Sequence, residues 1–113
     1  MTVLEELKVY CEVEETEQFD PQLLQLANQG LAYLANNKIP VVPIDSDSDQ
    51  TAFPEMGDFD YFIMLSWLSL HVLRLFDRTI SSASNTTSNW IDKQMENLLY
   101  QLKIKYDNGG GGL

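Results

Sequence analysis

The segment Tyr61–Phe76 constrains the fold most, because its apolar residues cover nearly the whole circumference of a helix. A helix that is apolar on all sides is buried either in a protein core or in a membrane. The run has only 16 residues and contains His71 and Arg74, whereas a bilayer span needs about 20 apolar residues. We therefore expect a helix over residues 58–78 at the centre of a helical bundle, without membrane contact.

Three further amphipathic segments predict helices near residues 3–12, 20–37 and 90–106. Thr2 and Glu5 have the spacing of a capping box at the start of the first of these helices. Asp20 followed by Pro21 is typical of a helix start, with Asp20 as the N-cap. The expected fold class is all-α: a small four-helix bundle with an apolar central third helix, a long acidic loop and a flexible C-terminal tail.

Two small residues lie on predicted apolar helix faces. Gly30 is in the middle of the second helix, where glycine costs about 1 kcal/mol relative to alanine. A close crossing with another helix would offset this cost. Cys11, the single cysteine, has acidic neighbours and is expected to be a small core residue, with neither a disulfide nor a cysteine-based zinc site available to it.

The chain has 113 residues, enough for one domain, and a net charge of −10. Nucleic-acid binding needs clustered cations, so this composition argues against it. Residues 1–60 have 13 acidic side chains and 2 lysines, net −11, whereas residues 61–113 have 4 acidic and 5 basic side chains, net +1. The imbalance suits packing of unlike surfaces in successive copies, and a plain solvated acidic surface accounts for it equally well.

The segment Lys38–Gly57 is long for a loop and contains three alternate aspartates, Asp45, Asp47 and Asp49. Their spacing resembles a calcium-binding loop, but the sixth and twelfth positions lack the Gly and Glu that such a loop needs. We expect no metal site here. We also expect Ile44–Ala52 to be mobile, because the aspartates repel one another and nothing in this stretch can fill a core.

Two other segments have the composition of flexible chain. Residues 81–89 are rich in Ser, Thr and Asn and predict a loop, and residues 107–113 are rich in Gly and predict a flexible tail. The expected organisation is a single helical domain over residues 1–106 followed by that tail.

Two helix faces combine large apolar or aromatic groups with cations, where a plain solvent-facing side would be polar throughout. One is a strip on the third helix, and the other is the side of the fourth helix opposite its apolar core face. Trp, Tyr and Arg are frequent anchors of interfaces, so we expect a subunit interface there. Its residues are Trp67, His71, Arg74, Arg78, Trp90, Tyr100 and Ile104. The alternative is that both tryptophans complete the core of a single domain.

No site for chemistry emerges from the sequence. His71 is the only histidine, and the sequence places no serine or cysteine nucleophile beside it. There is no Gly-rich phosphate loop after a strand, no metal-ligand cluster and no pair of carboxylates on a rigid face. We expect no enzyme activity and no cofactor.

Three stretches of the chain resemble the head–tail connector (adaptor) proteins of long-tailed bacteriophages. They are Val3–Val13 (VLEELKVYCEV), Asp20–Ala27 (DPQLLQLA) and the apolar element Phe62–Arg78 (FIMLSWLSLHVLRLFDR). The order and length of the helices also match, so the resemblance covers about residues 3–106. The long acidic loop and the glycine tail depart from the pattern of that family.

The resemblance implies a structural protein of the virion, assembled in the cytoplasm of a bacterial host. Its identical subunits would form a closed ring, about twelvefold, under the portal protein of a DNA-filled head, and the ring would dock the tail-completion protein. DNA would pass through without specific binding, which an acidic lumen favours. The alternative is an acidic inhibitor or DNA mimic that binds a basic partner and loses that binding steeply with salt.

Overall fold

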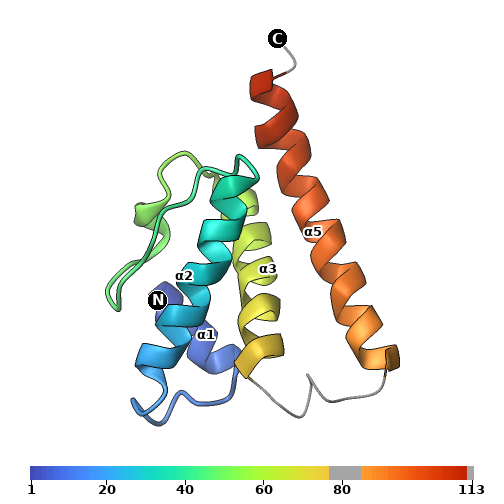
Figure 1. The fold of residues 1–113 in the computed structure, drawn as a ribbon. Helices are drawn as coiled ribbons and strands as arrows, with labels where there is room; N and C mark the ends of the chain where they lie inside the picture. Colours follow the sequence, from blue (N-terminus) through green and yellow to red (C-terminus); the bar gives the residue numbers. More distant parts are fainter. Residues whose placement is uncertain (77–84, 112–113) are drawn as a thin grey trace.

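The computed structural model describes residues 1–76 and 85–111, with side chains for residues 1–76 and 89–106. Within these residues the chain forms α-helices, one short 3-10 turn and no strand (Figure 1). The elements are α1 (Val3–Tyr10), α2 (Asp20–Asn36), η1 (Gln50–Ala52), α3 (Asp58–Phe76) and α5 (Asn85–Gly111). The all-α prediction is confirmed.

The helix α3 lies in the middle of the fold and contacts α1, α2 and α5. Figure 1 shows α2 and α5 on either side of it, with α1 near its carboxyl end. Its length and mean hydropathy of 1.3 would by themselves suit a membrane span. Because helices of the same chain pack around it, its apolar composition is that of a central core helix. The predicted apolar central third helix is confirmed, and the structure shows it partly buried.

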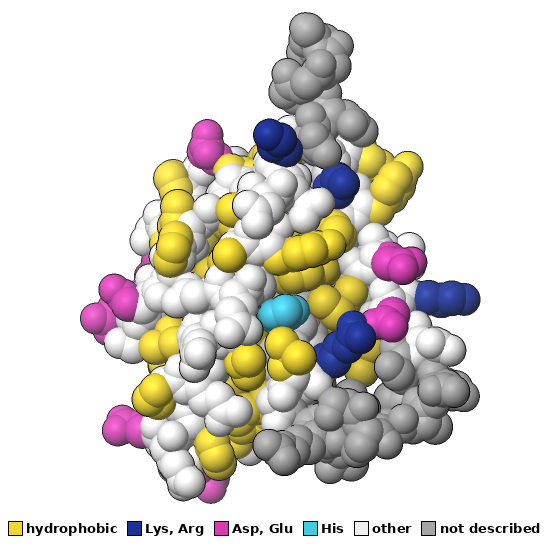
Figure 2. All heavy atoms as spheres, viewed as in Figure 1, with side chains coloured by type: hydrophobic (Ala, Val, Ile, Leu, Met, Phe, Trp, Pro, Cys, Tyr) yellow, Lys and Arg dark blue, Asp and Glu magenta, His cyan; other side chains and the backbone are white. Residues whose placement is uncertain are grey.

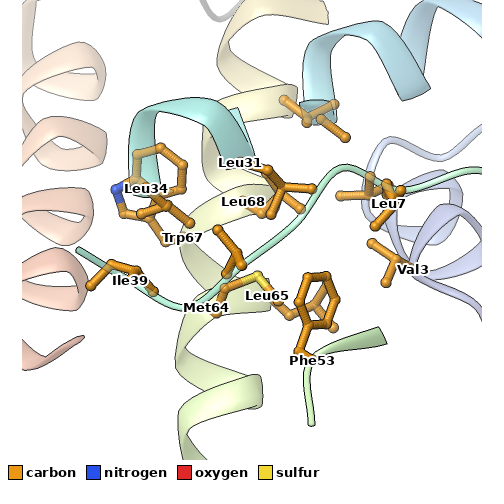
Figure 3. Close-up of a cluster of buried hydrophobic side chains, with 14 of the residues drawn as sticks. Val3, Leu7, Leu31, Leu34, Ile39, Phe53, Met64, Leu65, Trp67 and Leu68 are labelled. Atoms are coloured by element: carbon orange, nitrogen blue, oxygen red, sulfur yellow. The ribbon is translucent and has the colours of Figure 1, made fainter. Parts of the chain in front are cut away.

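The core joins side chains from the first two helices, the long loop and α3 (Figure 3). Leu7 of α1, Leu31 of α2 and Leu68 of α3 are almost completely removed from water. Phe53, which follows η1, is buried among them with 1% of its surface exposed. The loop between α2 and α3 therefore contributes directly to the hydrophobic core.

The start of α1 has the predicted capping box. The Thr2 hydroxyl accepts a hydrogen bond from the Glu5 amide, and the Thr2 amide donates to a Glu5 carboxylate oxygen. These bonds lower the pKa of Glu5. The helix ends at Tyr10 rather than at the predicted Glu12, because Glu12 has a positive φ of 60°, which no helical residue adopts. Cys11 caps the helix and packs, partly buried, against the core.

The prediction of Asp20 as the N-cap of α2 is wrong. Phe19 occupies that position without a side-chain hydrogen bond, and Asp20 is the first residue of the helix. The carboxylate of Asp20 instead pairs with Lys8 Nζ of α1 at 3.0 Å. The ion pair fixes the start of α2 beside α1, and the negative charge still lies favourably at the amino end of the helix.

The long acidic loop packs against the helices, whereas the sequence predicted that part of it would be mobile. Ile44, predicted to lie in a mobile stretch that could fill no core, is 7% exposed and belongs to the hydrophobic core. The side-chain amide of Asn28 on α2 binds both backbone groups of Ile44, with 2.8 Å from Ile44 N and 3.0 Å to Ile44 O. The backbone amide of Val3 donates to Ser48 O at 2.9 Å. The loop is thus fastened to α2 and to α1.

The aspartates of the loop hold its turns. Asp45 accepts hydrogen bonds from the Asp47 amide and the Ser48 hydroxyl, and Asp49 accepts from the amide and hydroxyl of Thr51. These bonds lower the pKa values of Asp45 and Asp49. Local hydrogen bonds of this kind are the usual reason for aspartate in turns, and they offset the charge repulsion that we expected to loosen the loop.

The helix α5 is longer than predicted at both ends. It begins at Asn85 rather than near residue 90, so part of the predicted loop 81–89 is helical, and it continues to Gly111 rather than ending at 106. Asn, Ser and Thr disfavour a helix interior by only about 0.5 kcal/mol each, too little to exclude one. Residues 81–84 lie outside the described residues. The flexibility of the glycine tail stays a prediction.

The Asn28 amide gives the first testable prediction. In Asn28→Ala both hydrogen bonds to Ile44 are lost, and we expect the free energy of unfolding to fall by about 1–2 kcal/mol. Limited proteolysis should then cut faster within residues 38–57. Gln25→Ala, on the exposed face of the same helix, is the control and should change neither result. Equal cleavage rates for the two variants would contradict the role of Asn28.

Candidate functional site

A groove runs between α2 and α5, and α3 forms its floor. Its volume is about 500 Å³, and its lining includes Tyr33 of α2, His71 and Arg74 of α3, and Asp92 and Leu99 of α5. Figure 2 shows the groove from the front, with the imidazole of His71 near its centre. The groove exists because α5 packs mainly against α3 and diverges from α2 (Figure 1).

Three aromatic rings are stacked along one wall of the groove. The rings of Tyr33 and Trp67 are 5.7 Å apart and 3° from parallel, and those of Trp67 and His71 are 5.2 Å apart and 8° from parallel. Trp67 lies in the middle of the stack and is only 3% exposed. Trp67 is therefore part of the core of its own chain, which was the alternative to an interface role in the sequence analysis.

The helices α2 and α3 cross closely at Gly30, as the glycine in the apolar face of α2 predicted. A β-carbon at position 30 would lie 2.8 Å from His71 Cδ2 and 2.9 Å from Leu68 Cδ1, closer than real side chains approach. Nε2 of His71 is buried on this side and has no hydrogen-bond partner. Burial, with a smaller contribution from the Arg74 charge, lowers the pKa of His71, so the neutral ring is favoured. Its position is that of a packing group.

Polar contacts attach α5 to α3 near both ends of the interface. Arg74 of α3 forms an ion pair with Asp92 of α5, and both side chains are partly exposed. Toward the other end, the buried Asp60 accepts a hydrogen bond of 2.8 Å from the Tyr106 hydroxyl and pairs with Lys105. Between these contacts, apolar side chains of α5 such as Leu102 are buried.

These contacts change the interpretation of the strip on α3. The sequence predicted a subunit interface on this strip, and in the structure Trp67 stacks on Tyr33 of α2 and Arg74 pairs with Asp92 of α5 within the same chain. Sequence periodicity places residues on one side of a helix, but it cannot show what covers that side. His71 and Arg74 remain accessible at the groove, while Arg78 lies outside the described residues. The predicted subunit contact of these residues stays a prediction.

The outer face of α5 carries the other predicted interface residues. Trp90, Tyr100 and Ile104 are 58%, 66% and 48% exposed. The alternative that Trp90 completes the core is therefore wrong, because the core side of α5 carries Ile91 instead, which is 3% exposed. Large apolar groups that remain uncovered in this way are typical of surfaces that bind another protein.

A second uncovered apolar surface was missed in the sequence. Phe59 and Phe62, at the start of α3, are 86% and 66% exposed. We expected this helix to be the central helix of the bundle, but α1, α2 and α5 leave Phe59 and Phe62 on one side of it uncovered. The only signal in the sequence was the placement of two phenylalanines one turn apart next to the acidic residues Glu55 and Asp58.

The described side chains contain no group of three or more His, Cys, Asp or Glu residues that could hold a metal ion. In the comparisons with known proteins, the family model described as phage connector protein matches residues 3–109. No curated protein and no solved structure gives a significant match.

The close crossing at Gly30 leads to a prediction about stability. Gly30→Ala gains about 1 kcal/mol in helix propensity, but overpacking against the stacked His71 ring costs about 1–3 kcal/mol. We expect a net loss of about 1 kcal/mol in the free energy of unfolding, measured by denaturant titration. Gly57→Ala is the control, because a β-carbon there meets nothing within 4 Å. A stability gain in Gly30→Ala would show that the crossing can relax.

The buried Asp60 predicts a pH dependence. The hydrogen bond from Lys105, followed by that from Tyr106, lowers the pKa of Asp60 in the folded state. A lowered folded pKa stabilises the fold above the unfolded pKa, about 3.9, and this contribution is lost as the pH falls through the folded value. Asp60→Asn should therefore be less stable than the wild type at pH 7 by about 1–3 kcal/mol, and the difference should shrink in acid.

Thermal or denaturant unfolding of both proteins between pH 7 and pH 2.5 measures this difference. Asp47→Asn, which removes an exposed carboxylate of the loop, is the control and should follow the wild type at every pH. A constant difference between Asp60→Asn and the wild type across this range would contradict the assignment of the charged Asp60 to the α5 attachment.

Proposed function

Since the chain belongs to the phage connector protein family, whose members are structural rather than enzymatic, we propose that it is the subunit of a closed ring at the head–tail junction of a tailed phage. The family match over residues 3–109, nearly the whole chain, carries this proposal. It favours a connector over an acidic inhibitor or DNA mimic, the alternative that composition alone left open. The head–tail connector role implies a component of the virion.

The ring would lie between the portal protein of the DNA-filled head and the tail-completion protein, with about twelve copies of the chain. A net charge of −10 per copy supports a conduit for DNA, because an acidic lumen repels phosphates and lets the duplex pass without specific binding. No catalytic step, cofactor or metal ion is required for this role.

The outer face of α5 supports a contact between subunits. Trp90 and Tyr100 are large aromatic groups in water, and such residues often provide most of the binding energy at an interface. We place the partner surface in the acidic first half of the neighbouring copy, because residues 1–60 carry −11 and residues 61–113 carry +1. Pairing of unlike halves is favourable, whereas pairing of two acidic halves is not.

The groove between α2 and α5 is a second place for contact. Trp67, His71 and Arg74 lie on its lining, and the ring of Trp67 stacks on that of His71. Together with Arg78 they form the proposed strip of the subunit interface. In the structure Arg74 already pairs with Asp92, so its contribution to a neighbour would use the part of the guanidinium that remains exposed.

Replacement of the outer face tests the proposal. In Tyr100→Ser combined with Ile104→Ser, we expect a folded protein by circular dichroism, because both side chains are exposed, Tyr100 to 66% and Ile104 to 48%. The variant should fail to join portal-bearing heads to tails in an assembly assay, with a loss of at least about tenfold in joined particles, equal to about 1.4 kcal/mol or more.

The matched control is Gln22→Ser combined with Gln25→Ser on the exposed face of α2, which should assemble like the wild type. Normal assembly by the Tyr100 and Ile104 variant would place the subunit contact elsewhere. If the wild-type chain itself neither binds portal-bearing heads nor supports joining, the connector function proposed for this chain is wrong.

A further inference from the structure

We infer that the uncovered side of α3 around Phe59 and Phe62 receives the outer face of α5 from a neighbouring copy, an inference that rests on the proposed ring. We call this side the α3 edge and define it by Phe59, Phe62, Ser66 and Leu73. At 100° per residue these four positions fall within about 60° of one another. They therefore lie along one side of the helix, with Phe59 and Phe62 exposed and Ser66 and Leu73 partly buried.

Most of the rest of α3 is covered by the chain itself. Asp60 and Arg74 contact α5, and Leu68 and His71 face α2 at the Gly30 crossing. The α3 edge leaves the most exposed apolar groups of this helix in water, with 86% of Phe59 and 66% of Phe62 exposed, whereas Leu75 near the carboxyl end is 48% exposed. A helix that is apolar on every side is expected to be covered on every side, so one neighbour is absent from the isolated chain.

The polar groups of the α3 edge are also compatible with an apolar partner. Ser66 is its only hydroxyl, and its Oγ donates to the Phe62 carbonyl in the same helix at 2.9 Å. Covering the edge with another helix would therefore leave no hydroxyl donor unsatisfied. At its amino end the edge is flanked by the exposed carboxylates of Glu55 and Asp58, so the matching surface should be apolar with a cation beside it.

The outer face of α5 has these properties. Trp90, Tyr100 and Ile104 form a stripe within about 80° of the helix circumference, and the exposed Lys93 lies inside it. This stripe points away from Ile91 and Leu102, which are buried toward α3 of the same chain. The outer face therefore cannot reach the α3 edge of its own chain, and the contact must be made with a second copy.

Charge also decides which surfaces pair. Two α3 edges packed in parallel would bring Glu55 and Asp58 against their own equivalents, and two outer faces packed in parallel would bring Lys93 against Lys93. The unlike pairing joins Lys93 to the acidic end of the α3 edge. Contacts between unlike surfaces continue from copy to copy and close into a ring when the rotation permits, as the proposed function requires.

Cross-linking between two introduced cysteines tests the pairing. In a Cys11→Ser background, Ser66→Cys marks the α3 edge and Asn97→Cys, within the stripe on α5, marks the outer face. Chains carrying both cysteines are bound to portal-bearing heads and treated with a short bismaleimide. We expect a ladder of covalent multimers on a denaturing gel, because each copy links to two neighbours.

The single-cysteine chains are the controls. Each alone should stay monomeric, and an equal mixture of the two should stop at covalent dimers. Dimers from Ser66→Cys alone or from Asn97→Cys alone would show pairing of like surfaces and overturn the inference. Normal joining of heads to tails by the double-cysteine chain without any ladder would also overturn it, while the ring function would stand.

A charge exchange gives an independent measurement. Glu55→Lys and Lys93→Glu should each reduce the fraction of joined particles about tenfold, and the chain that carries both changes should recover most of the loss. Loss in both single variants without recovery in the double variant would show that these charges do not face each other. Failure of the unmodified chain to bind heads would instead refute the ring itself.

Discussion

The close crossing of α2 over α3 at Gly30 positions the rest of the fold. Because no β-carbon separates the helices there, Leu68 and the ring of His71 pack directly against the backbone of α2. This contact aligns Tyr33, Trp67 and His71 into one stack. It also places Asn28, half a turn before Gly30 on α2, where its amide binds the backbone of Ile44 and secures the long loop.

The helices α2 and α5 are attached to α3 by different kinds of contact. The α2–α3 contact is made by apolar side chains and a glycine, whereas α5 is fixed near its ends by Arg74 with Asp92 and by Asp60 with Tyr106 and Lys105. Directional polar contacts specify the register of two helices better than apolar packing alone does. They leave α5 inclined away from α2, which opens the groove on one side and exposes the outer face on the other.

The sequence predicted features that depend on local chemistry and periodicity. The capping box, the four helices, the apolar third helix and the role of Gly30 all follow from residue type and spacing. The errors concern contacts between distant residues. Asp20 pairs with Lys8 instead of capping α2, and Ile44 is buried and bound by Asn28 instead of lying in a mobile stretch. The exposure of Phe59 and Phe62 was likewise missed, because it depends on where the other helices stop covering α3.

The exposed apolar groups of α3 and α5 make the free chain prone to non-specific association. Phe59, Phe62, Trp90 and Tyr100 would draw copies together in any orientation before a template is present. The net charge of −10 opposes such collisions, because like-charged chains repel at distances where apolar contact is not yet felt. In the proposed ring, the acidic surface would delay association until a partner surface holds successive copies in the one orientation that brings unlike patches together.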